Sequence, residues 1–128
     1  MKYGSIAAGE QTTLEAACHI LESGGNAFDA AVASAFTSMT SEFALTSAGG
    51  GGALLALPYN SEPILFDFFV DTLPVGNKIL DFFPVIIDFG TSKQNFNIGK
   101  GSVAVPGNIA DLLHVHKRLG LLPLNVVL

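Results

Sequence analysis

Charged residues are scarce in this sequence. Only 13% of its 128 residues are Asp, Glu, Lys or Arg, about half of the share in a typical soluble domain. A chain of this length can form one domain and bury a core. So little charge, however, would not cover the surface of an independent small globule. We therefore expect residues 1–128 to be a piece of a larger protein whose remainder covers the apolar surface. Residues 122–128 look like a helix that stops after about one turn, so the truncation is expected at the C-terminus.

Basic residues are also few, and there is no long hydrophobic run. Six Lys and Arg stand against 11 Asp and Glu, which gives a net charge of −5 without a basic cluster. This charge argues against nucleic acid and anionic membranes as partners. Asp81, Pro84 and Asp88 interrupt the best candidate for a membrane helix, which needs ~18 apolar residues. The N-terminal residues MKYGSIAAGE contain no apolar core of a secretory signal.

The chain has one cysteine and three histidines. Cys18 has no disulfide partner in the chain and is expected to be a buried thiol. His19 lies beside an apolar helical stripe, where an ordinary surface or hydrogen-bonded histidine is expected. His114 and His116 lack the i,i+3 or i,i+4 spacing of a helical metal-binding pair. We therefore expect neither a metal site nor a cofactor.

What the sequence does contain is a run of four glycines, Gly49, Gly50, Gly51 and Gly52, followed by the apolar residues 53–57. Glycine permits positive φ and close approach of other backbone, so the run predicts a tight, buried turn into a strand. Bulky substitutions at Gly50 or Gly51 should then clash. The alternative is a phosphate-binding loop, which runs from strand to glycines to helix. Here a helical pattern precedes the glycines, and no Gly-Lys-Ser/Thr follows.

Three main helices are predicted. Thr12 with Glu15 resembles a capping box, Asn26 and Asn108 are the expected N-caps of the next two helices, and Asp29 lies in a first turn. Gly24-Gly25 and Gly120 are expected helix ends, and Pro123 begins a short last helix. The expected buried positions are Leu14, Ala17, Cys18 and Leu21; Phe28, Ala31, Val32, Ala35, Phe36 and Met39; and Ile109, Leu112, Leu113 and His116.

The strand pattern predicts an antiparallel hairpin. Residues 52–57 and 64–70 are strand-like and are separated by the turn 58–63. Residues 82–89 read as an edge strand because of Pro84. The residues around 74–81 and the polar stretch 93–99 are expected to be irregular. Short strands are predicted at residues 6–8 and 102–105.

Four sequence blocks, taken together, resemble the gamma-glutamyltransferase (gamma-glutamyltranspeptidase) family. The chain has LEAACHILESGGNAFDAAVASA, where the family has ILxxGGNAxDAAVA, and EFALTSAGGGGALLA resembles its glycine-rich turn. FDFFVDTLP stands at the family's DFRExAP segment, and GSVAVPGNIADLLHVHKRLGLLP is similar to VAVPGxxxGLxxAHxxxGxLPW. The blocks come in the family's order and span essentially the whole chain.

The resemblance implies an α/β (α+β) fold, part of an N-terminal-nucleophile hydrolase with α/β/β/α layers and antiparallel sheets. Such precursors cut themselves into a large and a small subunit, and the new N-terminal threonine attacks the gamma-glutamyl amide. This chain matches the N-terminal part of the large subunit, so the resemblance places the threonine and the oxyanion-hole amides beyond residue 128. Implied partners are the rest of the large subunit, the small subunit and a gamma-glutamyl or acyl-amide substrate. The family is often periplasmic or extracytoplasmic.

One departure from the family bears on the substrate. The Arg of the DFR segment binds the alpha-carboxylate of the glutamyl group, and Phe69 occupies its place here. One extra residue also precedes Pro74, and Arg118 is the only arginine of the chain. Three explanations remain open. Another group holds the carboxylate, the substrate is apolar at this point, or the homologue is catalytically silent. Phe68 and Phe69 are expected to be one core-facing and one lid-facing aromatic.

Two functions follow from these observations. The first is the amino-terminal section of a gamma-glutamyltransferase-like amidohydrolase or acyltransferase, inactive without its threonine. The second is a non-catalytic homologue that keeps the fold as a structural or binding scaffold. A downstream threonine that becomes N-terminal on cleavage would distinguish them. An autonomous small-ligand binder is disfavoured by the low charge and by the last helix, which stops after about one turn.

Overall fold

The computed structural model describes residues 4–72 and 81–128. It divides into a larger unit, Met1–Phe69 with Pro106–Leu128, and a smaller unit, Val70–Val105. The expected loop around residues 74–81 and the Leu73-Pro74 end of the third block lie almost entirely outside the described residues. No helix of the described residues is long and apolar enough to cross a membrane.

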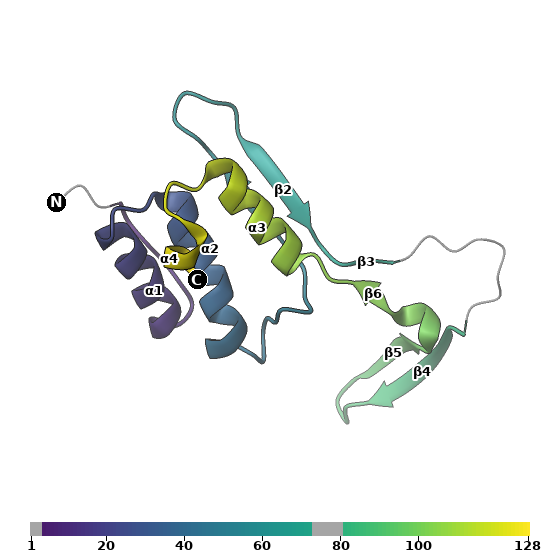
Figure 1. Cartoon of the computed structure of the whole chain (residues 1–128). Coiled ribbons are helices and arrows are strands. Elements are labelled where there is room, and N and C mark those ends of the chain that lie inside the picture. Colours follow the sequence, from purple (N-terminus) through teal and green to yellow (C-terminus); the bar gives the residue numbers. More distant parts are fainter. Residues whose placement is uncertain (1–3, 73–80) are drawn as a thin grey trace. The chain divides into compact units, whose positions relative to one another are not determined.

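The larger unit consists of helices packed on one side of a β-hairpin (Figure 1). Its helices are α1 (Gln11–Glu22), α2 (Ala27–Ser41), α3 (Asn108–Leu119) and the short α4 (Leu124–Val127). Strands β1 (Gly52–Ala56) and β2 (Ile64–Phe68) pair antiparallel, with Gly52 opposite Phe68 and Ala56 opposite Ile64. Helix α2 packs against α1, α3 and α4, and α3 packs against β2. The predicted α+β class and the first hairpin are therefore confirmed.

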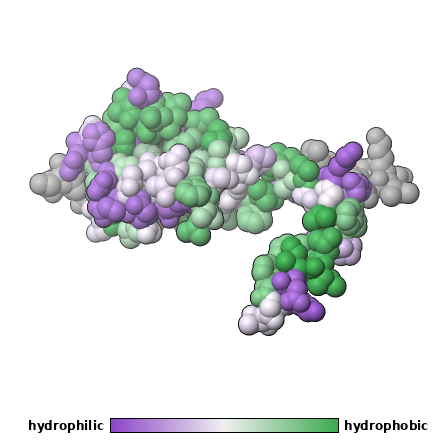
Figure 2. Space-filling view, turned by 90° about the horizontal axis from the view of Figure 1, so that it is seen from below, coloured by the Kyte–Doolittle hydropathy of each residue, from purple (hydrophilic) through white to green (hydrophobic). Residues whose placement is uncertain are grey.

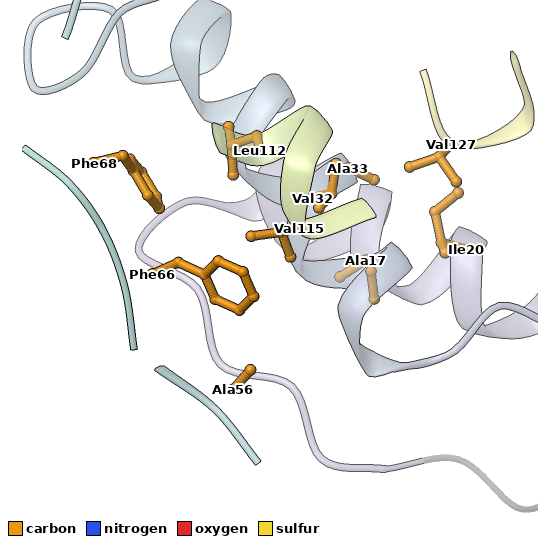
Figure 3. Close-up of a cluster of buried hydrophobic side chains, with 11 residues drawn as sticks. Ala17, Ile20, Val32, Ala33, Ala56, Phe66, Phe68, Leu112, Val115 and Val127 are labelled. Carbon is orange, nitrogen blue, oxygen red and sulfur yellow. The ribbon is translucent and has the colours of Figure 1, made fainter. Parts of the chain in front are cut away.

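The core of the larger unit lies between the helices and the inner face of this hairpin. Val32, Leu112 and Val115 are its most buried aliphatic side chains. Phe66 and Phe68 point from β2 into the same cluster (Figure 3). The alternation of the strand explains this arrangement, because residues two apart share a face of the sheet. Leu65 and Asp67, the two neighbours of Phe66 along the strand, are exposed.

The start of α1 differs from the prediction. Its N-cap is Glu10, not Thr12. The Glu10 carboxylate accepts hydrogen bonds from the backbone N–H groups of Thr12 (2.7 Å) and Thr13 (3.2 Å), donors that the helix itself leaves unpaired. Desolvation alone would raise the pKa of Glu10, but the hydrogen bonds from Thr13 and Thr12 outweigh it and lower the pKa.

The buried face of α1 also lies elsewhere on the helix. It consists of Thr13, Ala17 and Ile20, whereas Leu14, Cys18 and Leu21 are only partly buried. Thr13 is buried because its hydroxyl donates to Glu42 Oε1 (2.9 Å) and lies 3.1 Å from Ser41 Oγ. Periodicity could not show this, because a threonine on a helix gives no apolar signal. The helix ends as predicted, with Gly24 at φ +89° just beyond it.

Helix α2 begins at the predicted N-cap. The Asn26 side chain accepts from the N–H groups of Phe28 and Asp29, and the Asp29 side chain accepts from the N–H of Asn26. The buried residues are Asp29, Ala30, Val32 and Ala33. Five of the expected core residues are partly buried instead, namely Phe28, Ala31, Ala35, Phe36 and Met39. The difference arises because α2 has neighbours on several sides, so burial follows no single stripe.

Helix α3 has Gly107, not Asn108, as its N-cap. Asn108 is the first helical residue, and its side chain is buried against another segment. The buried positions are Asn108, Leu112 and Val115, while the expected Ile109 is 38% exposed and Leu113 and His116 are partly buried. The inward face is therefore displaced from the predicted stripe.

The smaller unit is built from paired strands. Strand β4 (Phe83–Asp88) pairs antiparallel with β5 (Lys93–Ile98). The 3-10 helix η1 (Lys100–Ser102) follows, and β6 (Ala104–Val105) pairs with β3 (Asp71–Thr72). The edge strand at residues 82–89 is thus confirmed.

The irregular stretch predicted at residues 93–99 is wrong, because polar residues 93–97 form most of β5. The prediction failed because pairing with β4, rather than its own composition, makes this segment a strand. The expected strand at residues 6–8 is also absent from the described secondary structure, in which residues 4–8 have no strand partner.

Candidate functional site

The candidate site is the end of β2, Asp67-Phe68-Phe69, where the resemblance implies a carboxylate-binding arginine. Phe68 is 7% exposed and belongs to the core, whereas the Phe69 side chain is 72% exposed. The expected core-facing aromatic is Phe68, and Phe69 is exposed, as a lid-facing residue would be. The exposed Asp67 accepts a hydrogen bond from the N–H of Phe69 at Oδ1 (3.2 Å). An apolar ring beside an exposed carboxylate is a poor environment for another anion.

Arg118 does not supply the missing cation at this end of the strand. Its guanidinium carbon lies 5.6 Å from the centroid of the Phe66 ring, over the face of that ring. Phe66 points into the core, while Phe69 is exposed. Arg118 therefore makes a cation–π contact between α3 and β2.

The glycine run holds the end of β2 in place through the start of α3. The carbonyl oxygen of Gly50 accepts hydrogen bonds from the N–H groups of Gly107 and Asn108, both at 3.2 Å. The Asn108 side chain donates from Nδ2 to the carbonyl of Ser47 (2.7 Å). Gly50 and Gly52 are crowded, because a Cβ on either would lie 3.1–3.2 Å from Asn108 or from the Phe68 ring. Residues 50–52 are partly buried where the run leads into β1, whereas Gly49 is exposed.

The backbone angles of the glycine run differ from the prediction. Positive φ was expected along the run, but Gly24, Gly90 and Gly99 are the described glycines that have it. Glycine is required at Gly50 and Gly52 because other atoms approach the backbone closely, and not because φ is positive there. The phosphate-binding alternative also fails on geometry. The run presents a carbonyl to the amides of α3, and two amides that could have bound an anion are occupied.

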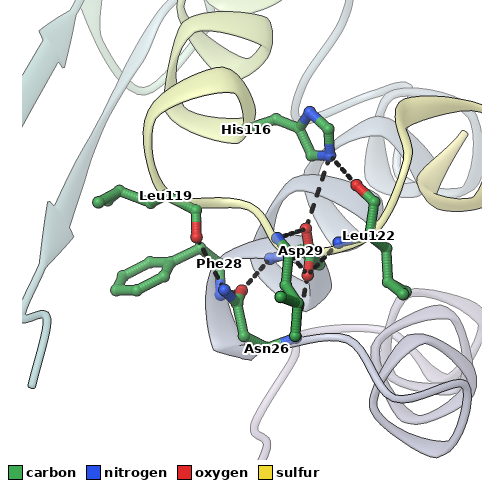
Figure 4. A network of polar contacts seen from close by, with 7 residues as sticks. Asn26, Phe28, Asp29, His116, Leu119 and Leu122 are labelled. Atoms are coloured by element: carbon green, nitrogen blue, oxygen red, sulfur yellow. Dashed lines mark hydrogen bonds and ion pairs between the residues drawn. The ribbon is translucent and has the colours of Figure 1, made fainter.

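A second polar cluster joins α2 to the turn after α3 (Figure 4). The fully buried Asp29 carboxylate accepts from the N–H groups of Leu121 (3.0 Å) and Leu122 (3.3 Å). Asn26 donates from Nδ2 to the carbonyl of Leu119 (2.7 Å). His116 Nε2 lies 2.9 Å from the Leu122 carbonyl and 3.6 Å from Asp29 Oδ1.

We interpret the role of this cluster as structural, because it links the start of α2 to the segment that follows α3. Its acceptors and donors are saturated by the chain itself, and among the described residues no buried side-chain nitrogen or oxygen lacks a partner. Only the helix-cap role of Asn26 and Asp29 could be predicted from the sequence. The partners on the α3 side lie more than 90 residues away in the sequence, so local pattern could not reveal them.

Two cavities among the described residues lie at α1. One groove of about 690 Å³ runs between the segment at residues 4–9 and the helices α1 and α2. A second, of about 300 Å³, is lined by Ile6, Leu14, Cys18 and Leu21 among others. Cys18 is therefore half-buried beside a pocket, and His19 is exposed as expected. Within residues 4–72 and 81–128, no three His, Cys, Asp or Glu lie together as a metal site would require.

Comparison with known proteins gives one consistent result. Residues 13–128 match the family model of gamma-glutamyltranspeptidase. The chain is 34% identical over 126 residues to the glutathione hydrolase proenzyme of Pseudomonas aeruginosa, covering 98% of this chain and 22% of that protein. The chain thus spans less than a quarter of that curated relative.

Solved structures agree with the sequence match. The fold is similar to a gamma-glutamyltranspeptidase from Pseudomonas nitroreducens complexed with L-DON, with a TM-score of 0.73 and 27% identity over 99% of this chain and 37% of that one. It is also similar to the gamma-glutamyltranspeptidase of Helicobacter pylori, with a TM-score of 0.76 and 26% identity over 99% and 36% of the two chains. On the match of residues 13–128 and these relatives, the chain belongs to the gamma-glutamyltranspeptidase family.

Proposed function

We propose that the chain is the N-terminal part of the large subunit of a gamma-glutamyltransferase-like enzyme, which receives its nucleophilic threonine from another part of the polypeptide. The observation that carries this proposal is coverage. Residues 13–128 match the family, yet the chain spans 22% of the length of the P. aeruginosa relative. The reaction would be transfer of a gamma-glutamyl or related acyl group from an amide to water or an amine, without a cofactor.

The exposed face of the first hairpin supports the layered arrangement that the family implies. Helices cover the inner face, which carries Phe66 and Phe68. On the outer face, Leu55 and Leu65 stand opposite each other and are 71% and 63% exposed. An apolar outer face favours packing against a second sheet. We infer that this sheet belongs to the remainder of the enzyme, as the α/β/β/α arrangement requires.

The contribution of this chain to catalysis would be to shape the acyl site. The nucleophile attacks an acyl carbon whose substituents must fit the surrounding surface, and Phe69 offers an aromatic ring where an arginine would bind an alpha-carboxylate. A ring cannot donate the paired hydrogen bonds of a guanidinium. Removing the partner of a buried carboxylate costs on the order of 2–5 kcal/mol. The enzyme should therefore favour acyl groups without an alpha-carboxylate.

The test compares donors on the full-length enzyme that contains this chain. We expect glutathione to be a poorer donor than a neutral acyl-amide in kcat/KM. Phe69→Arg should raise kcat/KM for glutathione at least about tenfold relative to the neutral donor, since 1.4 kcal/mol is a factor of ten. The matched control is Phe43→Arg, because Phe43 is another exposed phenylalanine of the larger unit (79%). Efficient glutathione hydrolysis that is insensitive to Phe69 would contradict the assignment of this site.

The second candidate is a non-catalytic homologue that keeps the fold as a scaffold. The presence of Phe69 in place of the arginine favours this candidate, because the loss of the arginine also fits a protein that no longer binds a glutamyl group. The two candidates differ in the downstream coding sequence. An enzyme needs a threonine that becomes N-terminal after cleavage, and a scaffold does not.

A further inference from the structure

The β4–β5 hairpin has one apolar and one polar face. Residues directly opposite each other in an antiparallel pair share a face, and Phe83 pairs with Ile98 while Val85 pairs with Phe96. Phe89 joins them, because its ring meets the Phe96 ring edge-on at 6.3 Å. We call this the apolar hairpin face; it consists of Phe83, Val85, Ile87, Phe89, Phe96 and Ile98. Gln94, opposite Ile87, is an uncharged polar residue on the same face.

The other face is suited to water. Lys93 and Asp88 form an ion pair there (3.1 Å), and the asparagines of β5 stand opposite the remaining residues of β4. Ile86 is the exception, and its side chain is 70% exposed. The polar residues on this face need no further partner, so the apolar hairpin face is the one that requires a cover.

Nothing described in the smaller unit provides that cover. None of residues 70–72 and 81–105 is buried. Phe83, Ile87, Phe96 and Ile98 keep 41–46% of their surface exposed. Apolar residues are visible over much of this hairpin in Figure 2. A two-stranded hairpin without a further layer is at best marginally stable in water.

We propose that the apolar hairpin face docks onto an apolar, uncharged surface of the remaining polypeptide of the same enzyme. This rests on the proposed function, under which most of the polypeptide lies outside this chain, as the 22% and 37% coverage of the relatives indicates. The face holds no charged side chain, so its partner should present none at the contact. The net charge of −5 disfavours a second copy and an anionic membrane as the occupant.

The experiment uses neighbouring positions that point to opposite faces. Tagged residues 1–128 are co-expressed with the polypeptide encoded downstream, and recovery of the complex is measured. Phe96→Asp should reduce recovery at least tenfold, whereas Asn95→Asp, the adjacent residue on the polar face, should change it less than twofold. Val85→Asp and Ile86→Asp form a second pair on β4. Helical circular dichroism of each variant verifies that the larger unit stays folded.

Each outcome separates the two proposals. Equal recovery of wild type and all four variants overturns the docking proposal but leaves the proposed function intact. Equal loss from both members of each pair also overturns docking, since face then has no effect. A dimer of the chain alone that Val85→Asp dissociates would show a second copy as the occupant and overturn it as well. Failure of the wild-type chain to bind the downstream polypeptide would overturn the proposed function itself.

Discussion

At the scale of single residues, Asp29 shows how a buried charge can serve the fold. Its side chain is completely buried, which is costly for a carboxylate unless hydrogen bonds compensate. Here the compensation comes from backbone N–H groups of Asn26, Leu121 and Leu122. Hydrogen bonds to an ionised acceptor are among the strong ones in proteins. The residue thereby ties the start of α2 to the segment that follows α3.

Replacing Asp29 by Asn should destabilise the chain while preserving the shape of the side chain. The amide keeps one acceptor oxygen, but its NH₂ group would face backbone N–H groups that also donate. Leaving buried donors unpaired costs about 1–3 kcal/mol. The measurement is the midpoint of urea unfolding, with Glu22→Gln as an exposed carboxylate control. An unchanged midpoint for Asp29→Asn would show that the network contributes nothing to stability.

At the scale of elements, the junction of the glycine run, β2 and α3 sets where Phe69 lies. Gly50 caps the helix start with its carbonyl, and Asn108 reaches back to Ser47. Gly107 passes so close to β2 that a Cβ would overlap the carbonyl group of Phe68. The residue before the candidate site residue is thus fixed by backbone contacts from two other segments.

Gly107→Ala should therefore destabilise the larger unit. The added methyl group must push α3 away from β2, and overpacking of this kind costs about 1–3 kcal/mol. Gly4→Ala is the control, because a Cβ at Gly4 meets no atom within 4 Å. Thermal unfolding should show a lower Tm for Gly107→Ala and no fall for Gly4→Ala. Equal melting temperatures would mean that the junction yields without cost.

At the scale of the whole molecule, the chain exposes two apolar faces that are suited to packing against further polypeptide. Leu55 and Leu65 cover the outer face of the first hairpin, and the β4–β5 hairpin exposes a separate apolar face. Patches of this kind on a monomer mark interaction surfaces. Two such faces, on two units of one short chain, agree with the scarcity of charge in the sequence.

Residues 1–128 alone should not turn over gamma-glutamyl-p-nitroanilide. Under the proposed function the nucleophile lies in another segment, and without one the acyl-transfer step has no attacking group. The assay offers the purified chain both this donor and a neutral acyl-p-nitroanilide, and the full-length enzyme acting on the neutral donor at equal concentration is the positive control. Robust turnover by residues 1–128 would show that the chain contains its own nucleophile and would refute the proposed division of labour.

The family, the α+β class, the first hairpin and the N-cap of α2 could all be predicted from the sequence alone. These depend on local composition, alternation and motif order, all of which can be read along the chain. The sequence also identified Phe69 as the departure from the family, and Phe69 is exposed, as a lid-facing residue would be.

The cap of α1, strand β5 and the partners of Asp29 could be seen only in the three-dimensional structure. Glu10 replaces Thr12 as the cap of α1 because its carboxylate reaches two backbone donors, and the polar segment of β5 is a strand because β4 pairs with it. Asp29 finds its partners about 90 residues away. For β5 and Asp29 the deciding groups come from another segment, and Glu10 is a local cap of a residue type that is not preferred at this position. In all three, hydrogen-bond satisfaction rather than hydrophobic periodicity selects the structure.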